Sequence, residues 1–329
     1  MANDERPGDL PQVLVLGPPI SFPFIKSLYS HKFHFLDPNT SSLPLHQFLT
    51  ADGRDPASIR AILSGAKSPV SPEILRLLPS LGLVVSCSAG LDHIDLAECC
   101  RRGIQVTSAR NVYSEDVADM AVGLLIDVGA NISAAARRVR SQVTSGAFHF
   151  PTSFKLRGKR VGIVGLGSIG METAKRLEAF GCIISYTSKN KKPLVSYSFY
   201  ESIVELASTS DALVLCCALN EQTRHMVSRE VMMALGREGI IVNIGRGGLI
   251  DEKELVNCLV KGEIGGAGLD VFEKEPHVPQ ELFELDNVVL SPHAAALTTE
   301  SKMGISQLVA ANLEAFFSSK PLLSHVRLD

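Results

Sequence analysis

Three charged side chains follow apolar strand patterns in the second half of the chain, and their types suit acid–base chemistry. Arg246 comes directly after the run Ile240–Ile244, Glu275 lies in the loop after Ala267–Leu269, and His293 follows the last strand pattern. Ligands of an open α/β sheet bind at the carboxyl ends of its strands, so these side chains are expected to reach one crevice. An arginine there can bind a carboxylate or carbonyl oxygen. A histidine can donate or take a proton near neutral pH, and a neighbouring carboxylate would favour the imidazolium and hold its tautomer.

Each of these residues also has an ordinary structural interpretation. An arginine at a strand end is often a surface salt-bridge partner, and Glu275 is one of three acids in a short loop. A single histidine such as His293 is more often structural than catalytic. The functional interpretation depends on their joint occurrence after a nucleotide-binding unit.

That unit is the stretch 161–190. An apolar run, Val161–Val164, predicts a buried strand, a helical pattern follows, and Cys182–Tyr186 predicts the next strand. The glycines at the first turn have the spacing G-x-G-x-x-G: Gly165, Gly167 and Gly170. In a βαβ unit such glycines allow a tight turn, the approach of a pyrophosphate and close packing of helix and strand, with the phosphates on free N–H groups at the helix start. The pattern predicts dinucleotide binding; the alternative is a glycine-rich loop in another α/β protein.

The end of the second predicted strand indicates which dinucleotide is bound. An NAD site usually has an acid about 20 residues after the first glycine, to hold the ribose 2′-hydroxyl. No acid occurs between Glu178 and Glu201, and the chain has instead Ser188, Lys189, Asn190, Lys191 and Lys192. A hydroxyl, an amide and cations suit a 2′-phosphate. We therefore expect NADP(H) rather than NAD(H); the alternative is an ordinary solvated lysine loop.

Composition narrows the class of protein. The 329 residues are enough for two domains, and a net charge of −3 gives no argument for nucleic-acid binding. The seven cysteines form no C-x-x-C pair, and Cys216 and Cys217 lie in an apolar strand pattern, which favours buried thiols in a reducing compartment over disulfides or a metal site. The amino terminus is polar and no apolar run is long enough to cross a membrane. We expect a soluble, cytoplasmic protein with no metal and no membrane partner.

Strand and helix patterns alternate along the chain, which predicts an α/β fold with parallel sheets. The predicted strands outside the glycine-rich unit are Val13–Leu16, Ala61–Leu63, Leu83–Cys87, Ile104–Val106, Ala212–Ala218, Ile240–Ile244, Ala267–Leu269 and Val288–Leu290. The predicted helices include one that begins at Pro72, then 95–102, 113–131, 201–207, 228–235, Asp251–Val260 and Thr299–Phe317. The last of these is long enough to return to the first domain.

Nearly the whole chain resembles the D-isomer-specific 2-hydroxyacid dehydrogenase family. Five segments carry the resemblance: SCSAGLDHID at 86–95, the glycine turn at 161–170, NIGRGGLID at 243–251, GAGLDVFEKEP at 266–276 and SPH at 291–293. Within the family the chain is most similar to plant glyoxylate/hydroxypyruvate and hydroxyphenylpyruvate reductases. The resemblance implies two Rossmann-like domains with parallel sheets and an active site in the cleft between them. It implies a substrate domain of residues 1–110 plus 299–329 and an NADP-binding domain of residues 111–298.

The resemblance also implies roles for individual residues. His293 would be the proton donor, Glu275 its partner and Arg246 the substrate clamp, and the main-chain N–H groups of Ala89 and Gly90 would hold the substrate carboxylate. The implied NADP contacts are Gly165, Leu166, Gly167, Ser168, Ile169, Ser188, Lys189, Asn190, Cys217, Ala218, Ile244 and Asp270. For Asp270 the alternative is a carboxylate that caps a loop. Family members are usually homodimers, with the helix 113–131 and the following loop as the interface; burial of that helix within one subunit explains its pattern equally well.

The expected reaction is reduction of a small 2-keto acid, glyoxylate or hydroxypyruvate, to the D-2-hydroxy acid. The hydride would come from NADPH and the proton from His293. One alternative is an aromatic keto acid reductase of the hydroxyphenylpyruvate type, since Ala294–Ala296 replaces a glycine and a serine of many relatives and could widen the pocket. An alternative of another class is a dinucleotide-sensing protein, like the corepressors related to this family.

Overall fold

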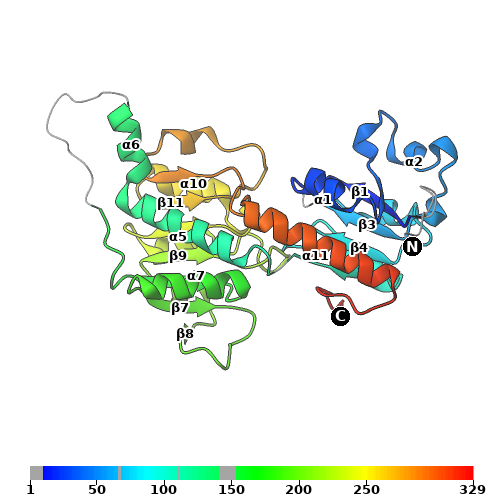
Figure 1. Ribbon diagram of the computed structural model, residues 1–329. Coiled ribbons are helices and arrows are strands. Elements are labelled where there is room, and N and C mark those ends of the chain that lie inside the picture. The colour runs from blue at the N-terminus through cyan, green and yellow to red at the C-terminus, as the bar shows by residue number, and fades with distance from the viewer. Residues whose placement is uncertain (1–9, 66–67, 110, 141–152, 329) are drawn as a thin grey trace. The chain divides into compact units, whose positions relative to one another are not determined.

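The computed structural model describes residues 10–65, 68–109, 111–140 and 153–328, and the chain divides into two compact units (Figure 1). Unit 1 comprises Met1–Tyr113 and Leu297–Asp329, and unit 2 comprises Ser114–Ala296. Every strand pairing in both sheets is parallel. The predicted α/β class with parallel sheets is therefore confirmed.

Unit 1 has a five-stranded sheet with the order β2-β1-β3-β4-β5. Its elements are β1 (Gln12–Leu16), α1 (Phe22–Tyr29), β2 (His34–Leu36), α2 (Leu45–Phe48), β3 (Ala61–Ser64), α3 (Pro72–Arg76), β4 (Leu83–Ser86), α4 (Leu96–Arg101), β5 (Gln105–Thr107) and α11 (Thr299–Phe317). The helix α11 comes from the far end of the chain and packs on α1 and β4.

Successive side chains of each strand point to opposite faces of the sheet, which gives unit 1 a core on each face. In β1, Val13 and Val15 join a cluster with side chains of α1 and α11. Leu14 and Leu16 join a second cluster with side chains of α3 and α4. Both faces are covered by helices, as a parallel sheet requires.

Unit 2 has a seven-stranded sheet with the order β12-β11-β10-β9-β6-β7-β8. Its elements are α5 (Ser114–Ala130), α6 (Ile132–Arg140), β6 (Arg160–Val164), α7 (Ser168–Ala179), β7 (Ile183–Thr187), β8 (Ser198–Phe199), α8 (Ile203–Ser208), β9 (Ala212–Leu215), α9 (Arg229–Leu235), β10 (Ile240–Asn243), α10 (Glu252–Val260), β11 (Gly266–Leu269) and β12 (Val288–Leu290). The strand order reverses between β6 and β9. In doubly wound folds ligands bind outside the carboxyl ends of the strands at such a switch point.

Several element boundaries differ from the prediction. The predicted strand Ala212–Ala218 ends at Leu215, so Cys216 and Cys217 lie beyond β9. The reason is that its neighbour β6 ends at Val164, whose carbonyl accepts the N–H of Cys216 at 2.8 Å before the chain turns away. The strands β2 and β8 and the helices α1, α2 and α6 were not predicted. The strand β8 has only two residues, which is too short for an alternating pattern to be read.

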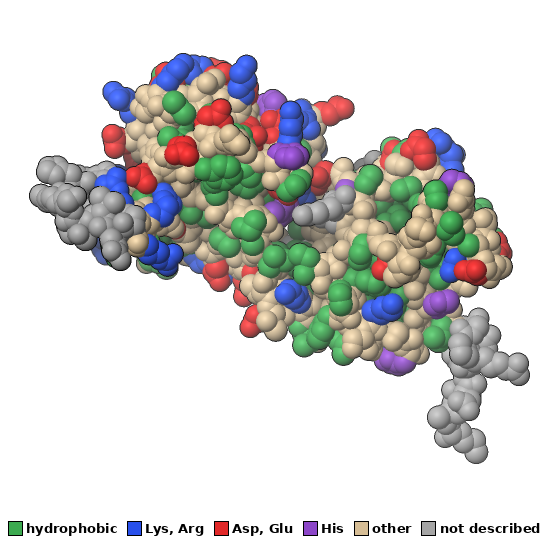
Figure 2. Space-filling view, turned by 90° about the horizontal axis from the view of Figure 1, so that it is seen from above, with side chains coloured by type: hydrophobic (Ala, Val, Ile, Leu, Met, Phe, Trp, Pro, Cys, Tyr) green, Lys and Arg blue, Asp and Glu red, His purple; other side chains and the backbone are tan. Residues whose placement is uncertain are grey.

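Surface features agree with the modest net charge. On the face drawn in Figure 2, acidic and basic side chains are interspersed and neither sign forms a broad patch.

Among the described residues, no single helix has the length and apolar composition to cross a membrane. Only α5 and α6 taken together pass that test, and they are bent by 61°.

Candidate functional site

The glycine turn between β6 and α7 has the geometry that a phosphate group needs. Gly165 has φ +97°, and a Cβ there would lie 2.6 Å from the Cβ of Cys217, so only glycine fits. A Cβ on Gly170 would lie 2.2 Å from the carbonyl oxygen of Gly165. At Gly167, by contrast, a Cβ would have no described atom within 4 Å outside its chain neighbours and its own helix. The main chain is therefore open to a ligand at Gly167 and closed at the other two glycines.

The amino end of α7 supplies hydrogen-bond donors at this open point. Its N-cap is Gly167, and no described side chain caps the helix. The first N–H groups of a helix have no partner within the helix, so those of Ser168 and Ile169 are available to an anion. Leu166 is buried beneath the turn. These residues suit the pyrophosphate of a dinucleotide, as the sequence predicted.

The segment after β7 has no acidic side chain. The hydroxyl of Ser188 donates to the carbonyl oxygen of Asn190 at 2.7 Å, which forms a tight turn. Lys189 and Asn190 are exposed, and no described carboxylate lies within ion-pair distance of Lys189. The segment therefore offers a hydroxyl, a main-chain turn and an ammonium group without a described carboxylate partner. These features can bind a phosphate oxygen.

Three adjacent strand ends meet at the glycine turn. Cys217 follows β9 and contacts Gly165, and buried Ile244 follows β10 with its N–H donating to Leu215 at 3.4 Å. The carbonyl oxygen of Ala218 accepts the hydroxyl of Thr223 at 2.8 Å. Burial raises the pKa of the Cys217 thiol to about 11, so it is protonated and unreactive at neutral pH.

His293 and Glu275 form a close pair at the carboxyl edge of the sheet. Nδ1 of His293 lies 3.0 Å from Oε1 and 2.9 Å from Oε2 of Glu275, and the side chains are 36% and 26% exposed. Because Nδ1 faces the carboxylate, Nε2 is the ring atom that can exchange a proton with a ligand. The structure thus brings together two of the predicted catalytic residues, which are 18 positions apart in sequence.

The loop that carries His293 is held by Asp270. The N–H of His293 donates to the Asp270 carbonyl oxygen at 2.7 Å. The Asp270 carboxylate is almost fully buried and accepts the N–H groups of Ala294 and Ala295 at 2.8 and 3.2 Å. His293 has φ +56°, an uncommon backbone conformation for a residue other than glycine, which these bonds stabilise. The observed bonds are those of a loop-capping carboxylate; a contact of Asp270 with the cofactor stays a prediction.

Arg246 lies in the turn after β10. This turn is held by Asn243, which was not among the predicted site residues. The side chain of Asn243 is fully buried; its amide donates to the Arg246 carbonyl at 2.9 Å and its oxygen accepts the Gly245 N–H at 3.0 Å. Nη1 of Arg246 donates to the Gly245 carbonyl at 2.9 Å, and the residue is half-buried. A polar residue at the end of an otherwise apolar strand was the signal that could have identified Asn243.

Ala89 and Gly90 belong to unit 1, in the loop after β4. This loop is fixed by two bonds of the neighbouring Ser88: the N–H donates to Ser86 Oγ at 3.1 Å and the carbonyl accepts Ala109 N–H at 3.0 Å. The hydroxyl of Tyr113 donates to the Cys87 carbonyl at 2.6 Å. The loop is thus held by its flanking residues, and Ala89 and Gly90 themselves are half-buried.

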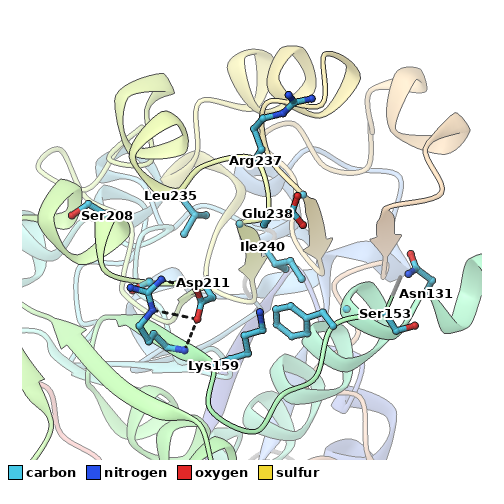
Figure 3. A pocket seen from close by; sticks show the side chains of 15 residues that line it. Asn131, Ser153, Lys159, Ser208, Asp211, Leu235, Arg237, Glu238 and Ile240 are labelled. Atoms are coloured by element: carbon cyan, nitrogen blue, oxygen red, sulfur yellow. Dashed lines mark hydrogen bonds and ion pairs between the residues drawn. The ribbon is translucent and has the colours of Figure 1, made fainter. Parts of the chain in front are cut away.

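Unit 2 contains a cavity of about 620 Å³ (Figure 3). It is lined by residues at the amino ends of the strands, including Arg160, Asp211, Ile240 and Gly265. In a parallel sheet this edge is opposite the edge that carries Gly165, Arg246 and His293. Because ligands of this sheet type bind at the carboxyl edge, this cavity is not our candidate site.

Comparisons with known proteins agree with the geometry. The family model described as "D-isomer specific 2-hydroxyacid dehydrogenase, NAD binding domain" matches residues 122–295. A glyoxylate/hydroxypyruvate reductase of Arabidopsis thaliana is 53% identical over 97% of this chain and 98% of its own length. A hydroxyphenylpyruvate reductase of Plectranthus scutellarioides is 49% identical over 82% of this chain and 86% of its own. The solved structure of an NADPH-dependent glyoxylate/hydroxypyruvate reductase of Sinorhizobium meliloti, in complex with NADP and malonate, superposes with a TM-score of 0.87 at 34% identity, covering 96% of both chains.

Proposed function

This chain belongs to the D-isomer-specific 2-hydroxyacid dehydrogenase family, and we propose that it reduces glyoxylate or hydroxypyruvate to the D-2-hydroxy acid with NADPH. The observation that carries the proposal is the pair of His293 and Glu275, 2.9 Å apart, on loops at the carboxyl edge of a dinucleotide-binding sheet. The pair supplies a proton donor beside the expected position of the nicotinamide.

The residues of unit 2 fit an NADP(H) cofactor. Open space beside Gly167 and the free N–H groups of α7 suit the pyrophosphate. Ser188, Lys189 and Asn190 suit the 2′-phosphate, because no acid is present to repel it. A bound NADPH would supply the hydride that is transferred to the keto carbon. The strand-end residues Cys217, Ala218 and Ile244 would line its binding site, with Asp270 beneath the loop of His293.

The side chains then have complementary roles in reduction. Negative charge develops on the keto oxygen as the carbon is reduced, and the Arg246 guanidinium would stabilise that charge. His293 would protonate the oxygen from Nε2, while Glu275 keeps the imidazole oriented. The main-chain N–H groups of Ala89 and Gly90 would bind the substrate carboxylate. We accordingly assign substrate binding to residues 1–110 plus 299–329 and cofactor binding to residues 111–298.

A second candidate is an aromatic keto acid reductase that acts on hydroxyphenylpyruvate. It is favoured by three small residues, Ala294–Ala296, directly after His293, and by the 49% identity to the Plectranthus reductase. Small side chains next to the proton donor leave more room for a large substrate group. This candidate uses the same cofactor and the same catalytic residues, so the two differ only in the preferred substrate.

We also propose that the protein is a cytoplasmic homodimer. Seven free thiols without a disulfide fit a reducing compartment. For the dimer, the helix α5 is mostly buried within its own unit, where it packs on α7, β10 and β11. The following helix α6 exposes Ile132 and Val139, 52% and 66% accessible, which supports α6 as part of the interface. Residues 141–152 of the loop that follows lie outside the described residues.

The test is NADPH oxidation with glyoxylate, hydroxypyruvate, pyruvate and hydroxyphenylpyruvate in parallel, repeated with NADH. We expect turnover on a small 2-keto acid with NADPH preferred. The variant His293→Asn, in which asparagine tolerates the positive φ, should lose about 10²–10⁴-fold in kcat while still binding NADPH. Preference for hydroxyphenylpyruvate would favour the second candidate. Tight NADPH binding with no turnover on any acid would favour a dinucleotide-sensing protein.

A further inference from the structure

A second histidine–glutamate pair lies on the same loop as Glu275. Nε2 of His225 is 2.8 Å from Oε1 of Glu273, which is two residues before Glu275. Nη1 of Arg224 lies 3.7 Å from the same oxygen. The side chains of His225 and Glu273 are 39% and 25% exposed, so the pair is partly shielded from water.

His225 links this loop to the one that carries Arg246. It comes from the loop after β9, and its N–H donates to the Gly248 carbonyl at 2.8 Å, in the turn after β10. His225 has φ +52°, a conformation that a non-glycine residue keeps only where its surroundings hold it. A Cβ on Gly247 would lie 1.9 Å from the main-chain carbon of Phe272, so the turn after β10 and the loop after β11 touch directly. The loops after β9, β10 and β11 therefore meet at Glu273.

The main chain of this loop is fixed as well. The Glu273 N–H donates to Oε2 of Glu252, at the start of α10, at 3.0 Å. Burial raises the pKa of Glu252, and the charge of Glu273 adds to this effect. One residue earlier, the Phe272 N–H donates to Oε1 of Glu275 at 3.3 Å. The contacts of Glu273 thus limit where Glu275 can be.

We propose that His225 and Glu273 are positioning residues that hold the loop 270–276 so that Glu275 stays on His293 and Arg246 keeps its orientation. The inference rests on the proposed function. Neither residue contacts the reacting groups in that function; each acts through its neighbours, because a shift of about 1 Å in a catalytic group is enough to lower the rate by up to about a hundredfold.

The test compares His225→Ala, His225→Gln and Arg229→Gln with the wild type. His225→Ala should lower kcat by about tenfold or more with little change in KM. His225→Gln should restore most of the activity, since its amide nitrogen can donate to Glu273. Should His225→Ala not fold, Glu273→Gln should give a smaller loss of kcat in the same direction.

The Arg229→Gln variant is a matched control. Arg229 and Glu263 also lie 2.8 Å apart in unit 2, with 41% and 25% exposure, but outside the loops described above. This variant should leave kcat unchanged. Equal effects of His225→Ala and Arg229→Gln on kcat, or no recovery of kcat in His225→Gln, would overturn the proposal.

Hydrogen exchange separates this inference from the proposed function. If the wild type turns over none of the four acids, the proposed function fails, but main-chain amide exchange over residues 270–279 still decides the positioning role. Faster exchange there in His225→Ala, and not in Arg229→Gln, supports the inference without any activity. Identical exchange in both variants overturns it.

Discussion

Ser188 and Lys189 are the residues that decide between the two nicotinamide cofactors in our proposal. The Ser188 hydroxyl closes a turn onto Asn190 at 2.7 Å, which leaves the exposed ammonium group of Lys189 next to it. Charge-assisted bonds to a phosphate are about twice as strong as neutral ones. A single cation is therefore enough to favour NADPH measurably over NADH.

Replacing Lys189 tests this directly. Lys189→Ala should lower kcat/KM for NADPH by about ten- to a hundredfold, in line with a charged hydrogen bond of about 1.5–3 kcal/mol, and leave the value for NADH nearly unchanged. The control is Lys192→Ala, because Lys192 is exposed on the same loop but lies outside the predicted contacts. The measurement is steady-state kinetics with both cofactors. Equal losses with NADPH and NADH would show that Lys189 does not contact a 2′-phosphate.

At the scale of elements, the central strands β6 and β9 are tied together at their amino ends. Asp211, just before β9, accepts both the main-chain N–H of Arg160 at 2.8 Å and its guanidinium at 2.7 Å (Figure 3). The hydrogen bond from the Arg160 side chain is the main cause that lowers the pKa of Asp211 below its ordinary 3.8, although burial opposes it. The ionised carboxylate therefore stabilises the folded state at neutral pH.

The sign of the pH dependence follows from that lowered pKa. The stabilisation is present above the unfolded pKa near 3.8 and is lost as the pH falls through the lower pKa of the folded state. Asp211→Asn should reduce the free energy of unfolding by about 1 kcal/mol at pH 7, and this difference should vanish in acid. The measurement is urea unfolding followed by circular dichroism, since the chain has no tryptophan. The exposed Glu221→Gln is the control, and a difference that stays constant with pH would contradict the assignment.

At the scale of the molecule, each unit has its own sheet and its own core. All the proposed cofactor contacts lie within Ser114–Ala296, while Ala89 and Gly90 belong to the other unit. We expect this division of labour to hold whether the preferred acid is small or aromatic.

The proposed dimer predicts the mass of the protein in solution. Sedimentation velocity should give twice the 35.4 kDa of one chain. Ile132→Asp should shift the protein toward the monomer, because a charge replaces an apolar side chain of the proposed interface. Leu194→Asp, at a residue that is 98% exposed, should leave the mass unchanged. A wild-type monomer at micromolar concentration would refute the dimer.

Local patterns in the sequence were enough to predict the fold class and to identify the candidate site residues that follow the strands. The glycine spacing predicts a turn because Gly165 and Gly170 have no room for a side chain, and that constraint is local. Arg246 and His293 could be identified as candidate site residues because each follows a predicted strand. The strand β8 was not predicted, because an alternating pattern cannot be read from two residues.

Only the tertiary structure decided which side chains support the predicted ones. Asp270 holds residues 24 and 25 positions later, and His225 meets Glu273 across 48 positions. Such contacts depend on how parallel strands far apart in sequence are ordered in the sheet, and no local pattern contains that order. The sequence therefore determined which residue types stand at the carboxyl edge, and packing between neighbouring loops determined how they are held.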